Sequence, residues 1–161
     1  MNRIGAPCAL IGGLALAPYK VIRATQDVDL LTEADRADDI DRELTTLGYR
    51  CVHRSPDAAN YLRGDERVDL LYANRPIARD LLSTALKHKT SFGELRVVSL
   101  EGLIGFKLQG LVNDPRRTQD LEDVRALLRA NKDTVNMNVV RGYFRLFEKE
   151  ALLDDILSGL D

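Results

Sequence analysis

The stretch that decides the fold is short: residues 8–15 read Cys-Ala-Leu-Ile-Gly-Gly-Leu-Ala, and residues 23–31 read Arg-Ala-Thr-Gln-Asp-Val-Asp-Leu-Leu. An apolar run that meets two glycines and then an Ala- and Leu-rich segment is typical of a strand, a tight turn and a short helix. Asp27 and Asp29 alternate with apolar residues, so the sequence predicts a half-buried strand with both carboxylates on one face.

The segments that follow predict an α/β half of the chain. Thr32 is suited to cap a helix, and apolar residues recur at helical spacing before Gly48, which predicts a helix over about residues 33–47. Pro76 is suited to open a second helix. Strands are predicted over residues 49–54, 67–72 and 95–98, and residues 55–64, between the first two, are turn-rich at both ends.

Beyond Ser99 the pattern changes to helices only. Apolar stripes at helical spacing span residues 100–111, 121–128, 135–147 and 152–160. We therefore expect an α/β core over residues 1–98 and a helical part over residues 99–161 that packs on this core.

The composition excludes several classes of protein. The chain has 161 residues, of which 45% are hydrophobic and 30% charged, as in folded globular proteins rather than disordered ones. No window approaches about 18 consecutive apolar residues, so no membrane span is expected. With 23 basic and 25 acidic residues the formal charge is -2, which gives no global basic field for nucleic-acid binding. Cys8 and Cys51 are the only cysteines, which favours a reduced, cytoplasmic compartment.

Three acidic residues are candidates for a metal site. Two carboxylates on one strand face do not both stay ionised at low cost without a cation, and Asp27 and Asp29 have this arrangement. Asp69 adds a third carboxylate on a strand-like segment, and no basic residue is expected among the three. If the two strands are neighbours, the acids form a site for Mg²⁺ or Mn²⁺, because hard oxygen ligands suit these ions. Gly12 and Gly13 let backbone N–H groups approach a phosphate.

Each of these features also has a purely structural interpretation. A D-x-D pair on a strand is often a solvated face, a pair of glycines is often a turn, and a single aspartate says little by itself. The order of the three features along one chain is what favours a functional site.

Lys107 falls within the apolar stripe of its predicted helix rather than on the polar face. A lysine in that place either extends its amine to solvent or has a buried anionic partner. Asp120 is predicted to face inward as well, so the two side chains either pair structurally or meet a nucleotide. Asp123 is predicted to face further from the stripe.

The order of the acids and glycines resembles the signature of the DNA polymerase β-like nucleotidyltransferase superfamily. That signature is a glycine turn, then an acid-x-acid pair, then a third acid on a later strand. The pair Gly12 and Gly13, the pair Asp27 and Asp29, and then Asp69 match it in this sequence.

A narrower resemblance comes from the R-x-T-x-D-x-D form of residues 23–29 and from the later helical residues Lys107, Asp120 and Asp123. These are similar to the branch that contains the abortive-infection (AbiE-type) toxin nucleotidyltransferases. Gln119 stands where that branch often has a basic residue.

The resemblance implies a nucleotidyltransferase fold: an α/β (α+β) core with a small mixed β-sheet and flanking helices, followed by a helical C-terminal part that closes a nucleotide cleft. It implies Mg²⁺-dependent (or Mn²⁺-dependent) transfer of a nucleoside monophosphate from a nucleoside triphosphate to a hydroxyl, with release of pyrophosphate. Asp69 would activate that hydroxyl. The implied catalytic and metal-binding residues are Asp27, Asp29 and Asp69, and the implied nucleotide-binding residues are Gly12, Gly13, Thr25, Lys107 and Asp120.

The resemblance also suggests a biological role. It favours a toxin of a bacterial toxin-antitoxin or phage-defence system that acts on an RNA end or a protein hydroxyl and has a cognate antitoxin. Two alternatives remain open: a nucleotidyltransferase that modifies a small molecule such as an antibiotic, and a catalytically silent nucleotide-binding or interaction module. The sequence identifies neither the acceptor, the preferred base nor the oligomeric state.

Overall fold

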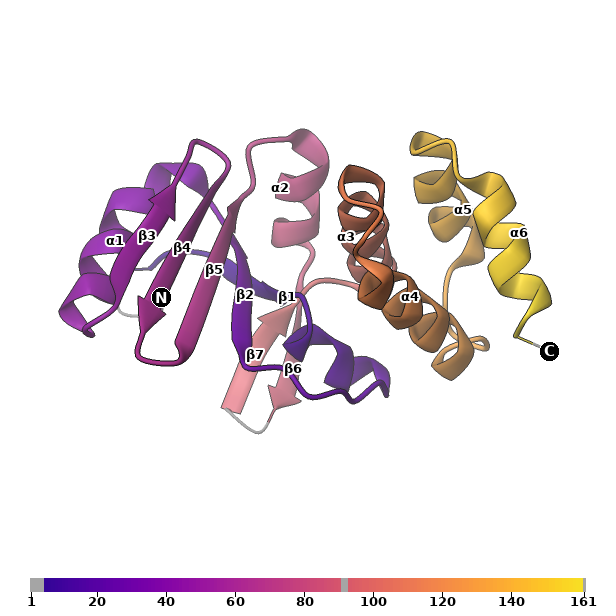
Figure 1. The fold of residues 1–161 in the computed structure, drawn as a ribbon, viewed down its shortest axis with the longest axis horizontal. Coiled ribbons are helices and arrows are strands. Elements are labelled where there is room, and N and C mark those ends of the chain that lie inside the picture. The colour runs from indigo at the N-terminus through magenta and orange to yellow at the C-terminus, as the bar shows by residue number, and fades with distance from the viewer. Residues whose placement is uncertain (1–4, 91–92, 161) are drawn as a thin grey trace. The chain divides into compact units, whose positions relative to one another are not determined.

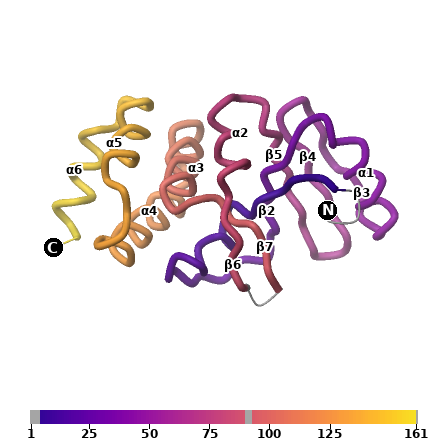
Figure 2. Tube along the Cα trace, turned by 180° about the vertical axis from the view of Figure 1, so that it is seen from behind, coloured from indigo at the N-terminus to yellow at the C-terminus, as the bar shows by residue number. Residues whose placement is uncertain are grey.

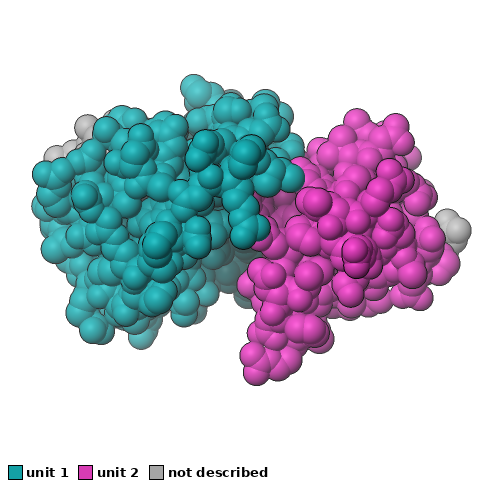
Figure 3. All heavy atoms as spheres, turned by 90° about the horizontal axis from the view of Figure 1, so that it is seen from above, with its two compact units in different colours: residues 1–15, 23–99 teal, residues 16–22, 100–161 magenta. Residues whose placement is uncertain are grey.

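The computed structural model describes residues 5–90 and 93–160 of the chain. The chain forms two compact units, which Figure 3 colours separately. The first unit comprises residues 1–15 and 23–99, and the second comprises residues 16–22 and 100–161. Each unit is described by itself below.

The first unit is built on one mixed sheet (Figure 1). The described residues place seven strands in the order β3-β4-β5-β2-β1-β7-β6. Two neighbouring pairs, β1 with β7 and β2 with β5, are parallel, and the other four pairs are antiparallel. The strands are β1 (Cys8–Ile11), β2 (Asp27–Thr32), β3 (Arg50–Arg54), β4 (Ala58–Arg63), β5 (Glu66–Tyr72), β6 (Leu86–Thr90) and β7 (Gly93–Val97).

One face of this sheet is apolar and is covered by α1 (Ala37–Thr46), which follows the short 3-10 turn η3 (Ala34–Arg36). Figures 1 and 2 both show α1 beside β3 and β4. Tyr61 of β4 is fully buried there, and its hydroxyl donates to Asp41 of α1 at 2.9 Å. Along β5 buried residues alternate with half-buried ones, the pattern of a strand with one covered face.

Most of the predicted elements are confirmed. The segments predicted as strands correspond to β1, β2, β3, β5 and β7, and Pro76 opens α2 (Pro76–Ser83). The helix predicted from residue 33 divides into η3 and α1.

Two strands, β4 and β6, are not predicted from the sequence. β4 lies inside residues 55–64, where the sequence predicts turns at both ends but no strand between them. It begins with alanines and an asparagine, which have low β propensity and hide the strand. β6 reads Leu-Lys-His-Lys-Thr, and its lysines are typical of an exposed edge strand, where charge discourages pairing with another chain.

The second unit is helical. Its helices are α3 (Leu100–Asn113), α4 (Thr118–Ala130), α5 (Met137–Leu146) and α6 (Glu150–Ser158), which confirm the four apolar stripes. The end of the 3-10 helix η2 (Leu14–Tyr19) also belongs to this unit. Asn131, after α4, donates its side-chain amide to the Tyr19 carbonyl at 2.9 Å. This bond fastens the residue 16–22 segment to the helices.

The core of the helical unit is closely packed. Gly105 of α3 lies against the ring of Tyr143 in α5, and a Cβ on that glycine would lie 3.1 Å from the ring. Asn136 caps α5, because its side chain accepts from the N–H groups of Asn138 and Val139. Within the described residues, no helix has the length and apolar character needed to cross a membrane.

Candidate functional site

The three acids predicted to act together are gathered on one face of the sheet. β5 lies beside β2 in parallel register, so Asp69 is the direct partner of Asp29, and Asp27 is the partner of Arg67. Directly paired residues share a face, as do residues two apart on one strand. The condition set by the sequence, that the two strands are neighbours, is therefore confirmed.

The expectation that no basic residue lies among these acids is wrong. Nε of Arg67 donates to both carboxylate oxygens of Asp69 at 2.9 Å. The hydrogen bond to Asp69 raises the pKa of the Arg67 guanidinium, and the charges of Asp27 and Asp29 add to this. The arginine thus neutralises part of the charge that three clustered carboxylates would otherwise carry.

Asp69 has a second donor. The side-chain amide of Asn60, on β4, donates to its Oδ1 at 2.7 Å. Asn60 and Asp69 are direct partners in the antiparallel register, so this bond runs along a cross-strand row. The third carboxylate is consequently held in a fixed orientation from two sides.

The glycine turn presses directly against the second acid. Gly12 has a φ of +67°, in the left-handed region, and a Cβ built on it would lie 1.9 Å from Oδ2 of Asp29. No side chain fits there while Asp29 keeps its place. At Gly13 a Cβ would lie 3.0 Å from Nη2 of Arg23 and 3.0 Å from Cβ of Thr25. A guanidinium and a threonine therefore border the turn, where an anion would be bound.

The predicted metal can be tested against these donors. Asp27 and Asp29 are hard oxygen ligands on one face, beside the turn, which is the donor chemistry that Mg²⁺ requires. Asp69 is turned to Arg67 and Asn60 instead. Accordingly, the described part of the chain contains no group of three His, Cys, Asp or Glu side chains arranged to hold a metal ion. The first two acids fit the ion, and the third fits it only if it leaves Arg67.

In the helical unit, the inward placement predicted for Lys107 is confirmed. The residue is only 5% exposed, and its Nζ lies 3.1 Å from Oδ1 of Asp120 and 2.6 Å from Oδ2 of Asp123. Arg117 adds an ion pair to Asp120, with Nε at 2.7 Å from Oδ2. Two cations thus balance two carboxylates, as burial of charge requires.

The prediction that Asp123 faces away from the stripe is wrong. Asp123 is 2% exposed, less than Asp120 at 5%. It stands four residues before the buried Leu127, and residues four apart lie on the same side of a helix. Gln119, in the place of the branch's basic residue, donates to Oδ1 of Asp123 at 3.2 Å.

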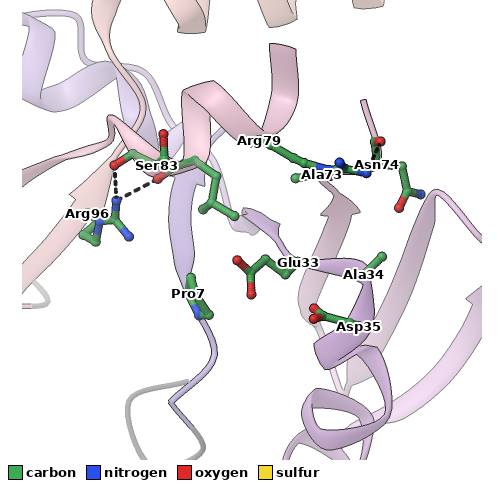
Figure 4. A pocket seen from close by; sticks show the side chains of 10 residues that line it. Pro7, Glu33, Ala34, Asp35, Ala73, Asn74, Arg79, Ser83 and Arg96 are labelled. Carbon is green, nitrogen blue, oxygen red and sulfur yellow. Dashed lines mark hydrogen bonds between the residues drawn. The ribbon is translucent and has the colours of Figure 1, made fainter. Parts of the chain in front are cut away.

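A separate hollow of about 650 Å³ lies at the opposite end of the strands, where Pro7 precedes β1 and Ala73 follows β5. Figure 4 shows the carboxylates of Glu33 and Asp35 on one side of it. Its two arginines serve the backbone: Arg79 donates to the carbonyls of residues 73 and 74, and Arg96 to those of residues 82, 83 and 85. This hollow does not include the acids or the glycine turn.

Three residues at the sheet site were not predicted from the sequence. Arg67 stands two residues before Asp69, so the alternation of a strand was sufficient to place it beside the acids. Asn60 belongs to β4, a strand that the sequence does not predict. Arg23 was part of the recognised string but carried no predicted role.

No family profile and no curated protein sequence matches this chain. Solved structures do. The chain is similar to the antibiotic-resistance factor ANT(2'')-Ia, with 17% identity over 99% of this chain and 91% of that one, and a TM-score of 0.68. It is similar to the lincosamide antibiotic adenylyltransferase LnuA with lincomycin bound, with 16% identity over 78% of this chain and 88% of that one, and a TM-score of 0.57.

A third similar structure is an antigenic nucleotidyltransferase-like protein from Paracoccidioides brasiliensis. Its identity is 18% over 98% of this chain and 86% of that one, with a TM-score of 0.58. At such identities the similarity establishes the fold, and the AbiE-type branch stays a hypothesis from the sequence. The chain has the nucleotidyltransferase fold.

Proposed function

We propose that this protein is a divalent-metal-dependent nucleotidyltransferase. The observation that carries the proposal is the pairing of Asp29 with Asp69 across neighbouring strands, with Asp27 on the same face and Gly12 packed against Asp29. On this fold, such an arrangement supports transfer of a nucleoside monophosphate from a nucleoside triphosphate. The fold alone does not specify the chemistry, so the site residues have to carry it.

Each residue has a proposed part in the reaction. The backbone at Gly12 and Gly13, with Thr25 beside it, binds the triphosphate, and Asp27 and Asp29 hold Mg²⁺ or Mn²⁺. The bound ion would neutralise charge on the phosphates. Asp69 takes the proton of the acceptor hydroxyl. The oxygen of this hydroxyl bonds to the α-phosphorus of the triphosphate, and the bond between that phosphorus and the leaving pyrophosphate breaks.

Nucleotide binding by Lys107 and Asp120 rests on the sequence resemblance. In the structure their charges are already balanced within the helical unit by Asp123 and Arg117. We therefore propose a positioning role for Lys107, which orders α3 against α4. The alternative is that Lys107 contacts the triphosphate directly, and the variant Lys107→Met distinguishes the two roles.

For the biological role we propose, from the narrower resemblance, a toxin of a toxin-antitoxin or phage-defence system with a cognate antitoxin. The resemblance to LnuA and ANT(2'')-Ia favours a second candidate, transfer to a small molecule such as an antibiotic. Growth inhibition on expression, relieved by a neighbouring gene product, would support the first. Antibiotic resistance without growth inhibition would support the second.

The direct test uses the purified protein with each labelled nucleoside triphosphate, Mg²⁺ and a panel of acceptors. We expect label transfer that a chelator abolishes. Asp29→Ala should abolish transfer and keep or raise the melting temperature, because repulsion among the acids is relieved. Asp35→Ala, an exposed acid away from the glycine turn, is the control and should retain transfer. Full transfer by Asp29→Ala in excess chelator would refute the proposal.

A further inference from the structure

Beyond Asp69 the face of the sheet that carries the acids continues over β4 and β3, which contain no acidic residue. Asn60 of β4 is the partner of Asp69, and His53 of β3 is the partner of Asn60. One row across the sheet thus runs from Asp29 through Asp69 and Asn60 to His53 at the sheet edge.

A second row runs parallel to the first. It leads from Asp27 of β2 to Arg67 of β5, then to Leu62 of β4 and Arg50 of β3. The register of β3 shifts between Cys51 and His53, so Arg50 and His53, although three residues apart, are both paired with residues of the same face of β4. Paired residues share a face, so this row ends beside the first one. We call the four side chains beyond the acids the edge strip; it consists of Arg50, His53, Asn60 and Leu62.

The edge strip carries one formal positive charge, the guanidinium of Arg50, and no carboxylate. Arg50 and His53 are exposed, and the segments that form β3 and β4 contain no Asp or Glu. Arg67 lies where the strip meets the acids, and its guanidinium is paired with Asp69. The charge on this face therefore changes sign across the sheet, from the carboxylates of β2 to the guanidinium of Arg50 on β3.

The chemistry of phosphoryl transfer determines what meets this strip. The attacking oxygen and the leaving group lie roughly in line on opposite sides of the phosphorus. If the leaving pyrophosphate is held at Gly12 and Gly13 after β1, the acceptor enters from the other side of Asp69, over β4 and β3. The two strands give it a platform on the order of 10 Å wide.

We propose that the acceptor is an anionic, phosphate-bearing molecule whose phosphate is bound by Arg50 and His53 of the edge strip. The inference rests on the proposed function and adds the class of acceptor. Complementary charge attracts such an acceptor and repels a polycationic amino sugar such as tobramycin. Arg50 supplies the geometry for a bidentate contact with phosphate, and Asn60 and Leu62 form the floor between Arg50 and the reacting hydroxyl.

Binding is tested first, without catalysis. The full chain is titrated into a fluorescent single-stranded RNA oligonucleotide at low and moderate salt. We expect salt-sensitive binding that Arg50→Glu weakens about tenfold or more, with a shallower salt dependence. Arg75→Glu removes an exposed arginine at the other end of the strands and should bind as the wild type does. A sugar phosphate is titrated in parallel, and equal binding of both phosphate-bearing molecules by the wild type and Arg50→Glu would overturn the inference.

Transfer assays then separate the sources of the phosphate. An RNA oligonucleotide, a free sugar phosphate and tobramycin are offered with the labelled triphosphate that the protein binds. We expect one of the two phosphate-bearing acceptors to be labelled and Arg50→Glu to raise its KM. Labelling of tobramycin, unchanged or faster in Arg50→Glu, would overturn the inference and leave the proposed function intact. Mg²⁺-dependent triphosphate binding in a thermal-shift assay, lost in Asp29→Ala, reports on the proposed function independently.

Discussion

The packing of Gly12 against Asp29 gives the sharpest prediction. In Gly12→Ala the new Cβ would start 1.9 Å from Oδ2 of Asp29, whereas ordinary contact begins near 3.4 Å. The carboxylate oxygen therefore has to retreat by about 1.5 Å, and a misplacement of about 1 Å in a catalytic site can cost about a hundredfold in rate. We expect Gly12→Ala to lose at least about a hundredfold in nucleotidyl transfer.

The same substitution also carries a cost in stability that has to be separated from the effect on the site. A non-glycine residue at a φ of +67° costs about 1–2 kcal/mol. For a chain of this size that lowers the melting temperature by about 2–8 °C. The rate assay is therefore run well below the melting temperature of the variant.

Gly64 supplies the matched control. It lies in the turn between β4 and β5 with a φ of +58°, and a Cβ there would meet nothing within 4 Å. Gly64→Ala should lose similar stability and keep its transfer rate. The reasoning is refuted if Gly12→Ala transfers at the wild-type rate, or if Gly64→Ala loses as much activity as Gly12→Ala.

Two further predictions concern buried polar groups. Lys107→Met removes one of the cations that balance two buried carboxylates, so urea unfolding should show that the free energy of unfolding falls by about 3–5 kcal/mol. Near-native stability together with weak triphosphate binding would instead show that the lysine contacts the nucleotide. Tyr61→Phe loses the hydrogen bond to Asp41 and should cost about 1 kcal/mol at neutral pH. Burial and the hydrogen bond to Asp41 both raise the pKa of the Tyr61 hydroxyl. The wild type should therefore lose stability as the pH rises above about 10, and Tyr61→Phe should lose less. Identical alkaline unfolding profiles of the two proteins would contradict this.

The local pattern of the sequence is sufficient for most of the sheet and for all four helices of the helical unit. β2 and β5 each contain apolar residues around an aspartate, Val-Asp-Leu-Leu in both, and this pattern can be found within the strand itself. β4 was missed because its residues become strand-like only through pairing with β3 and β5 on both sides. A short window of sequence does not predict which distant segments pair with one another.

The site could be predicted to the same extent. The three acids and the glycine turn follow from spacing, but Asn60 depends on the register of a strand that was missed. Asp123 was misplaced for a different reason. The spacing of Asp120 to Val124 favours Asp120 as the inward acid, but Asp123 has the same four-residue spacing to the buried Leu127 within α4, and both acids are buried.

The buried acids of α4 and the acids on the sheet are neutralised in physically different ways, and this difference is relevant to function. Lys107 is 5% exposed, so removing its charge leaves carboxylates that water does not solvate. The side chains of Arg67 and Asp69 are 46% and 24% exposed, where solvent screens their attraction and an ion pair is worth little. Asp69 can therefore exchange Arg67 for another cation at small cost, and the released guanidinium lies beside the edge strip. Arrival of a metal ion at the acids would in this way free a positive charge on the side where we propose that a phosphate-bearing acceptor binds.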